Sequence, residues 1–97
     1  MSSSPRVLRF QARALQQIDE ALGYVHARSP QGAAKVEARL TDLLERLRAH
    51  PKLGVRTSVA GVRRISLVSY PYLVDDVTTD AAIIVQRFRH TARRPVP

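Results

Sequence analysis

Two apolar stripes with helical spacing, separated by Ser29 and Pro30, constrain the fold of this chain more than any other feature. Across residues 12–28, apolar side chains recur every three or four positions, at Leu15, Ile18, Leu22 and Val25. The second stripe contains Ala33, Val36, Leu40, Leu43, Leu44 and Leu47. Ser29 can cap a helix, Pro30 suits its first position, and the residue before Pro51 avoids helical geometry. The pattern predicts an antiparallel helical hairpin whose stripes lie on a sheet.

Four short segments have the composition of β-strands. They are residues 7–10, 62–68, 72–77 and 81–85, and residues 55–59 form a further short extended segment. In the 62–68 segment, Ile65 and Leu67 share one face while Arg64 and Val68 share the other, so we expect this strand inside the sheet. The order β-α-α-β-β-β predicts an α+β fold, with the helical hairpin packed on a small, twisted antiparallel sheet.

The segment at residues 72–77 contains two adjacent carboxylates, Asp75 and Asp76. Aspartate is unfavourable in strands, and two in succession place one carboxylate on each face. We therefore expect a β-bulge, an early end of the strand, or neutralisation by Arg64 or Arg87. Pro71, just before this segment, cannot donate to a strand ladder, so the chain direction is expected to change there.

The length and composition are those of one domain spanning residues 1–97, with residues 1–5 and 95–97 expected to be frayed. There is no cysteine, the acidic residues are scattered, and no two histidines stand at ligand spacing, so we expect no metal site. The four glycines form no phosphate-binding loop, so we expect no cofactor. No segment has the apolar run of a signal peptide or a membrane span, and we expect a soluble, cytoplasmic protein without membrane contact.

The net charge of +8 is concentrated in the second half of the chain. Six basic residues between positions 46 and 74, and four after Asp80, face no acidic residue in those stretches. Such a distribution favours a polyanionic partner, either nucleic acid or an acidic protein segment. The chain has three tyrosines and two phenylalanines, most of them expected in the core, which disfavours a simple nucleic-acid-binding domain that stacks bases on exposed rings.

Several local motifs occur in a defined order along the chain. They are Ser29-Pro30, Pro51-x-x-Gly54, Gly61-Val62-Arg63, Tyr70-Pro71-Tyr72 and His90-x-x-Arg93-x-Pro95. With these motifs and this order of elements, the chain resembles the RelE/ParE family of bacterial toxins and is most similar to the ParE branch. It departs from the family pattern at Asp75 and Asp76, where the strand is one residue shorter and lacks a second tyrosine.

The resemblance implies the toxin component of a bacterial type II toxin–antitoxin module. ParE-like toxins inhibit DNA gyrase and replication, and a cognate antitoxin neutralises them in a hetero-oligomer. The partner implied here is a ParD-like antitoxin with an acidic C-terminal segment. Its expected contacts are apolar side chains of the hairpin and the tyrosine turn, namely Leu15, Leu22, Leu40, Leu44, Tyr70 and Tyr72.

The candidate target-binding residues are basic side chains of the later strands and the C-terminal tail. They are Arg63, Arg64, Arg87, Arg89, His90, Arg93 and Arg94. Guanidinium groups bind carboxylates or phosphates in pairs, which suits a large anionic target such as gyrase.

The alternative is a RelE-like, ribosome-dependent mRNA endonuclease, with the ribosome and mRNA as partners. Its candidate catalytic residues are His90, Arg63, Arg64 and Arg87, with the histidine as general acid or base and the arginines on the scissile phosphate. The RelE branch uses lysines and a tyrosine near the C-terminus, whereas this chain has no tyrosine after Tyr72 and no lysine after Lys52. We therefore rank gyrase inhibition first. A structural role for His90, packed against Tyr70 or Tyr72, is the simpler interpretation of that residue.

Overall fold

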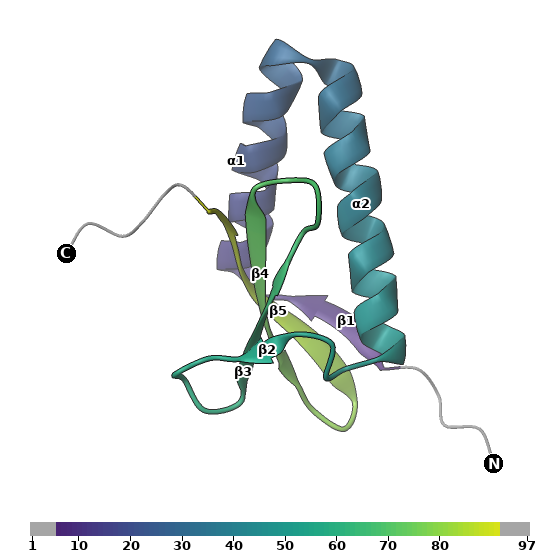
Figure 1. Ribbon diagram of the computed structural model, residues 1–97, viewed down its shortest axis with the longest axis vertical. Helices are drawn as coiled ribbons and strands as arrows, with labels where there is room; N and C mark the ends of the chain where they lie inside the picture. Colours follow the sequence, from purple (N-terminus) through teal and green to yellow (C-terminus); the bar gives the residue numbers. More distant parts are fainter. Residues whose placement is uncertain (1–5, 92–97) are drawn as a thin grey trace.

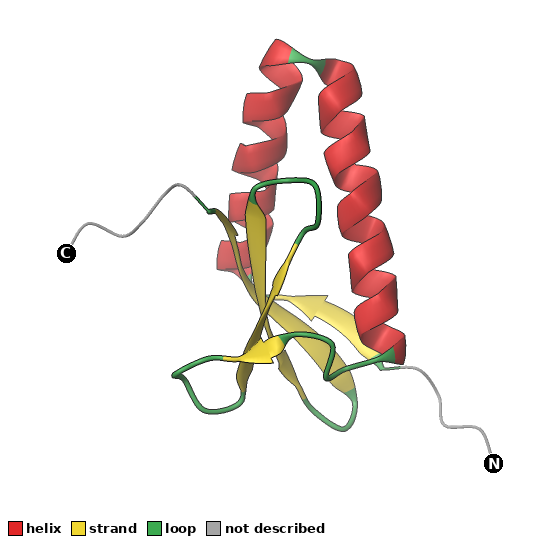
Figure 2. Cartoon of the chain, viewed as in Figure 1, coloured by secondary structure: helices red, strands yellow, loops and turns green. Residues whose placement is uncertain are grey.

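The computed structural model describes residues 6–91, which form two helices and five strands (Figure 1). In chain order these are β1 (Val7–Phe10), α1 (Ala12–Arg28), α2 (Pro30–Ala49), β2 (Val55–Arg56), β3 (Val62–Ser66), β4 (Tyr72–Thr78) and β5 (Ala82–His90). The helices run side by side from a common turn, and the strands form a twisted sheet across their other ends (Figure 2). The predicted α+β fold, a helical hairpin packed on a small sheet, is confirmed.

The turn between the helices is built as its local chemistry predicts. Ser29 Oγ accepts a hydrogen bond from the Gly32 N–H at 2.9 Å, and Pro30 stands in the first turn of α2. At the other end of α2, the His50 N–H donates to the Arg46 carbonyl at 2.8 Å. Each end of α2 is set by residues close to it in the sequence. The bounds of the helix could therefore be predicted without tertiary information.

The sheet has the strand order β1-β5-β4-β3-β2 and is mixed. β1 pairs with β5 in parallel, whereas the other three pairs are antiparallel. The prediction of an antiparallel sheet is therefore corrected at β1, and the extended segment at residues 55–59 contributes the short strand β2. Each of the strands from β2 to β5 is connected to the next by a short turn, so these neighbours are antiparallel. The helical hairpin connects β1 to the rest of the sheet, and this long connection permits β1 to pair with β5 in parallel.

The strand predicted at residues 62–68 ends two residues early, at Ser66. A turn follows, in which the Leu67 N–H donates to the Tyr72 carbonyl at 2.9 Å and Ser69 adopts a φ of 78°. Leu67 is fully buried, as its alternation with Ile65 predicts. Val68 is 69% exposed, so its placement in the strand was wrong, because the turn takes up the residues that would have extended β3.

One face of the sheet is buried against the helices. Its core side chains come from the inward-facing positions of β4 and β5, namely Tyr72, Val74, Ile83, Val85 and Phe88. The stripe of α2 packs on them as predicted, with Val36, Leu40, Leu43, Leu44 and Leu47 all buried. The stripe predicted for α1 was wrong at Leu15, which is 52% exposed, whereas its neighbour Ala14 is fully buried in the core. Ile18 and Leu22 are partly buried against the core, so this stripe is less enclosed than that of α2.

A side chain of α1 fixes the second half of β5. β1 pairs with β5 as far as Val85, and beyond that residue this edge of β5 has no strand partner within residues 6–91. There the Phe88 N–H donates instead to Gln17 Oε1 at 2.8 Å, which satisfies a partly buried backbone donor. The bond holds the part of β5 that carries Arg87 and Arg89.

Candidate target-binding face of the sheet

Strand register gathers three of the candidate arginines on one face of the sheet. Arg64 of β3 pairs with Asp75 of β4, which pairs with Arg87 of β5, and Leu73 pairs with Arg89. Paired residues project to the same side, and these positions alternate with the buried positions of β4 that form the core. The three guanidinium groups therefore lie on the face opposite the helices.

A fourth arginine on this face was missed in the sequence. Arg9 of β1 pairs with Ile84, whose other partner, Val77, lies on the same face as Asp75. Arg9 alternates with Leu8 and Phe10 in the sequence, which indicates that its side chain faces away from theirs. This pattern does not reveal which strand lies beside β1. We call the four residues Arg9, Arg64, Arg87 and Arg89 the cationic face.

Asp75 organises the cationic face. Its oxygens accept from Arg64 Nε at 2.7 Å and Arg64 Nη2 at 3.1 Å, and Arg89 Nη2 lies 3.5 Å away. The hydrogen bonds to Asp75 raise the pKa of the Arg64 guanidinium. Of the two arginines expected as alternatives, Arg64 neutralises Asp75, and Arg89, which was not expected to do so, is a second cation beside it. Arg87 has no ion pair among the described residues.

Asp76 lies on the opposite, helix-facing side. The expected β-bulge is present between Asp75 and Asp76, where Asp75 pairs with Arg87 but Asp76 pairs with Val85. The Asp76 side chain is fully buried, and neither carboxylate oxygen has a hydrogen-bond partner among the described residues. Burial raises the pKa of Asp76 to about 6, although the charge of Arg63 lowers it in part.

The other candidate residues of the described chain do not join the cationic face. Arg63 pairs with Asp76, so it projects toward the helices, and its Nη1 donates to the Gly54 carbonyl at 3.0 Å. His90 packs edge-on against the Tyr72 ring, with centroids 5.3 Å apart, as the structural interpretation predicted. The four residues considered for an endonuclease are therefore divided between two faces. Arg93 and Arg94 lie outside the described residues.

The residues expected to contact an antitoxin differ in accessibility. Leu40, Leu44 and Tyr72 are buried in the core, with 5%, 5% and 6% exposure. Leu22 and Tyr70 are partly buried at its border, and Leu15 is exposed. Among these side chains, Leu15, Leu22 and Tyr70 are the ones that a partner can reach on the folded chain.

The described residues offer neither a metal site nor a membrane-spanning helix. Residues 6–91 contain no group of three or more histidine, aspartate or glutamate side chains placed to hold a metal ion. Neither of the two helices combines the length and apolar character needed to cross a membrane.

Comparisons of the sequence place the chain among known toxins. Residues 8–95 match the family model described as ParE toxin of type II toxin–antitoxin system, parDE. The candidate toxin Y4kP of Sinorhizobium fredii is 27% identical over 88 residues, which cover 90% of this chain and 92% of that protein.

Solved structures share the fold. A chain in the chromosomal ParDE toxin–antitoxin system from P. aeruginosa matches with a TM-score of 0.76 at 19% identity, covering 91% of this chain and 98% of that chain. A chain in the E. coli DinJ–YafQ complex matches with a TM-score of 0.59 at 16% identity, covering 90% and 94%. The family model spans nearly the whole sequence, so the chain belongs to the ParE toxin family of type II toxin–antitoxin systems.

Proposed function

We propose that this toxin inhibits DNA gyrase, and thereby replication, by binding it through the cationic face. The observation that carries the proposal lies on the face that the helices leave uncovered, where Arg64 and Arg89 form ion pairs with Asp75. Arg87, the cross-strand neighbour of Asp75 on β5, projects from the same face without an ion pair among the described residues. Arginines held in place by Asp75 lose little further freedom when they bind an anionic surface, and their forked N–H groups suit its carboxylates. Arg93 and Arg94 follow β5 in sequence and are included in the proposed contact.

The division of residues between the two faces favours a binding inhibitor over an endonuclease. A general acid or base must lie within hydrogen-bond reach of the group it serves, next to the residues that hold the phosphate. His90 packs edge-on against Tyr72 on the helix-facing side, whereas Arg64 and Arg87 project from the other side. Cleavage of RNA by this set requires a rearrangement of β5, whereas binding through the cationic face does not.

We also propose that a cognate antitoxin, ParD-like and with an acidic C-terminal segment, binds and neutralises the toxin. The half-exposed stripe of α1, from Leu15 through Ile18 to Leu22, offers an apolar surface of the kind that takes an amphipathic segment. The net charge of +8 complements an acidic partner. Because gyrase acts in the cytoplasm, we place both the toxin and this complex there.

Replacing Arg87 tests the role of the cationic face. Arg87 has no ion pair among the described residues, so Arg87→Gln should leave the fold intact. Loss of a charge-assisted contact should raise the concentration needed to inhibit gyrase by about tenfold or more. The matched control is Arg13→Gln, the same change at an exposed position of α1. Equal inhibition by both variants in a supercoiling assay would remove Arg87 from the proposed contact.

A further inference from the structure

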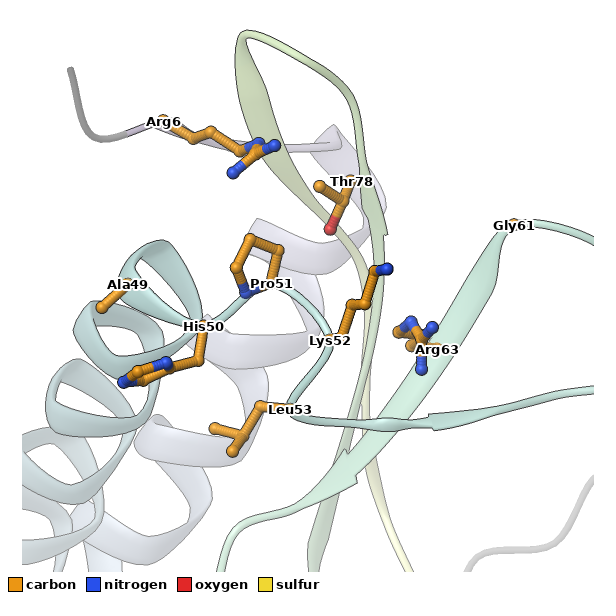
Figure 3. Close-up of a pocket in the computed structure, with 9 residues that line it drawn as sticks. All are labelled: Arg6, Ala49, His50, Pro51, Lys52, Leu53, Gly61, Arg63 and Thr78. Atoms are coloured by element: carbon orange, nitrogen blue, oxygen red, sulfur yellow. The ribbon is translucent and has the colours of Figure 1, made fainter. Parts of the chain in front are cut away.

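A cavity of about 930 Å³ lies where the C-terminal end of α2 approaches β3 and β4 (Figure 3). It is on the helix-facing side of the sheet, because Arg63 in its wall pairs with Asp76 on that side. Its volume is in the range that small organic ligands occupy. The cavity is thus separate from the cationic face and from the gyrase contact proposed above.

The wall of the cavity is cationic. Arg6, Lys52 and Arg63 are among the nine residues that line it, and none of the nine is acidic. Figure 3 shows Lys52 extending from the turn after α2 toward the side where Arg63 and Thr78 stand. Three cations converging from distant parts of the sequence on one hollow make an anion the complementary ligand.

Two of the three cations are already held in place. Arg6 Nε donates to the Thr79 carbonyl at 2.7 Å, and Arg63 Nη1 donates to the Gly54 carbonyl at 3.0 Å. The Arg6 backbone is itself fixed, because Arg48 Nε donates to its carbonyl at 2.9 Å. A guanidinium has five N–H donors, so one such anchor leaves a pair of donors for a ligand. Because these side chains are already ordered, the entropic cost of binding a ligand is lower.

An unsatisfied hydroxyl lies in the same wall. Thr78 Oγ1 is buried and has no hydrogen-bond partner among the described residues, although Thr78 lines the cavity. Buried polar atoms nearly always have a partner, and a hydroxyl can donate to an anionic oxygen. Asp76 stands two residues earlier on the same face and offsets part of the charge, but the lining cations outnumber it three to one.

The cavity also has an apolar side, formed by Ala49, Pro51 and Leu53. A ligand that fills it therefore combines a charged group with an apolar body. A phosphate monoester carries close to two charges and three acceptor oxygens at neutral pH, whereas a carboxylate carries one charge and two oxygens. Three cations and a hydroxyl match the phosphate better.

We propose that this cavity binds a phosphate monoester attached to an apolar or aromatic body, as in a nucleotide. Lys52, Arg63 and Thr78 hold the phosphate, with Arg6 at its side, and Pro51 and Leu53 contact the body. The same chemistry is offered by a free nucleotide and by the 5′-phosphorylated end of a nucleic acid. The site is independent of the gyrase contact, so either proposal can fail alone.

The test is a calorimetric titration of the full-length chain at fixed salt with adenosine 5′-monophosphate, with adenosine, and with N-acetylglutamate. N-acetylglutamate is a dicarboxylate whose two charges match those of the monophosphate but stand on separate carboxylates. We expect binding of the monophosphate and none of adenosine or N-acetylglutamate. An eight-nucleotide oligomer with a 5′-phosphate, compared with its 5′-hydroxyl form, then separates the two sources. Competition by the phosphorylated oligomer identifies a nucleic-acid end, and its absence identifies the free nucleotide. Binding of adenosine or N-acetylglutamate as tight as that of the monophosphate overturns the proposal.

Two lysine variants locate the site. Lys52→Gln should weaken binding of the monophosphate about tenfold or more, because it removes a charged donor. Lys35→Gln is the matched control, since Lys35 and Lys52 are the chain's two lysines and Lys35 is exposed on α2 away from the cavity. Thr78→Val should also weaken binding of the monophosphate without disturbing the fold, because the hydroxyl it removes has no hydrogen-bond partner in the described part of the chain. Equal affinities of the two lysine variants would overturn the assignment.

Discussion

Leu47→Ala is expected to lower the free energy of unfolding by about 2–5 kcal/mol. Leu47 is fully buried near the end of α2, within the cluster formed by the stripe of α2 and the inner positions of β4 and β5. The substitution removes buried methyl groups and leaves a cavity that close-packed neighbours fill only in part. Domains of this size have total stabilities of roughly 5–15 kcal/mol, so the variant loses a large part of its margin.

Urea denaturation followed by circular dichroism measures this loss. Leu15→Ala is the control, because Leu15 belongs to the helix whose stripe is less enclosed and is 52% exposed. It should cost less than about 1 kcal/mol. If the two variants lower the unfolding midpoint equally, the helices have been placed on the sheet with the wrong sides inward.

Asp76→Asn is expected to change how stability depends on pH. The pKa of Asp76 in the folded protein is about 6, above the ordinary 3.8, because burial disfavours the charged form. A raised folded-state pKa gives a contribution that is fully present below about pH 4 and is lost as pH rises through 6. With 1.36 kcal/mol per pKa unit, the loss at pH 7 is about 3 kcal/mol.

Asparagine cannot ionise, so the variant should escape this loss. Relative to the native chain, its free energy of unfolding should rise by about 3 kcal/mol more at pH 7 than at pH 3.5. Asp80→Asn, the same change at an exposed position in the turn before β5, should produce no such difference. Urea titrations at both pH values decide the matter, and an unchanged pH profile for Asp76→Asn would mean that this carboxylate is not buried in solution.

The helices could be predicted from the sequence because their signals are local. A period of 3.6 residues shows which side of α2 is buried, and Ser29, directly before the helix, is its N-cap. The sheet could be predicted only in part, because a period of two shows a strand but neither its partner nor its direction. That is why the parallel pairing of β1 with β5 and the early end of β3 at Ser66 appear first in the structure.

The site shows the same limit. Adjacent aspartates signalled a bulge and a compensating arginine, and both are present at Asp75. The register of the strands, which the sequence does not reveal, places Arg64 and Arg63 on opposite faces of the sheet. It also places Arg9 on the same face as Arg64. The cavity could not be predicted from the sequence for a related reason. Arg6, Lys52 and Arg63 are far apart in the sequence and come together only in the folded chain.

The most direct test of the account is an assay of purified gyrase on relaxed plasmid with the purified chain added, run beside an mRNA cleavage assay in a translation extract. We expect inhibition of supercoiling, relief of that inhibition by the cognate antitoxin, and no cleavage of mRNA. Cleavage that is lost on His90→Ala, together with unaffected supercoiling, would contradict the account and assign the chain to the endonucleases.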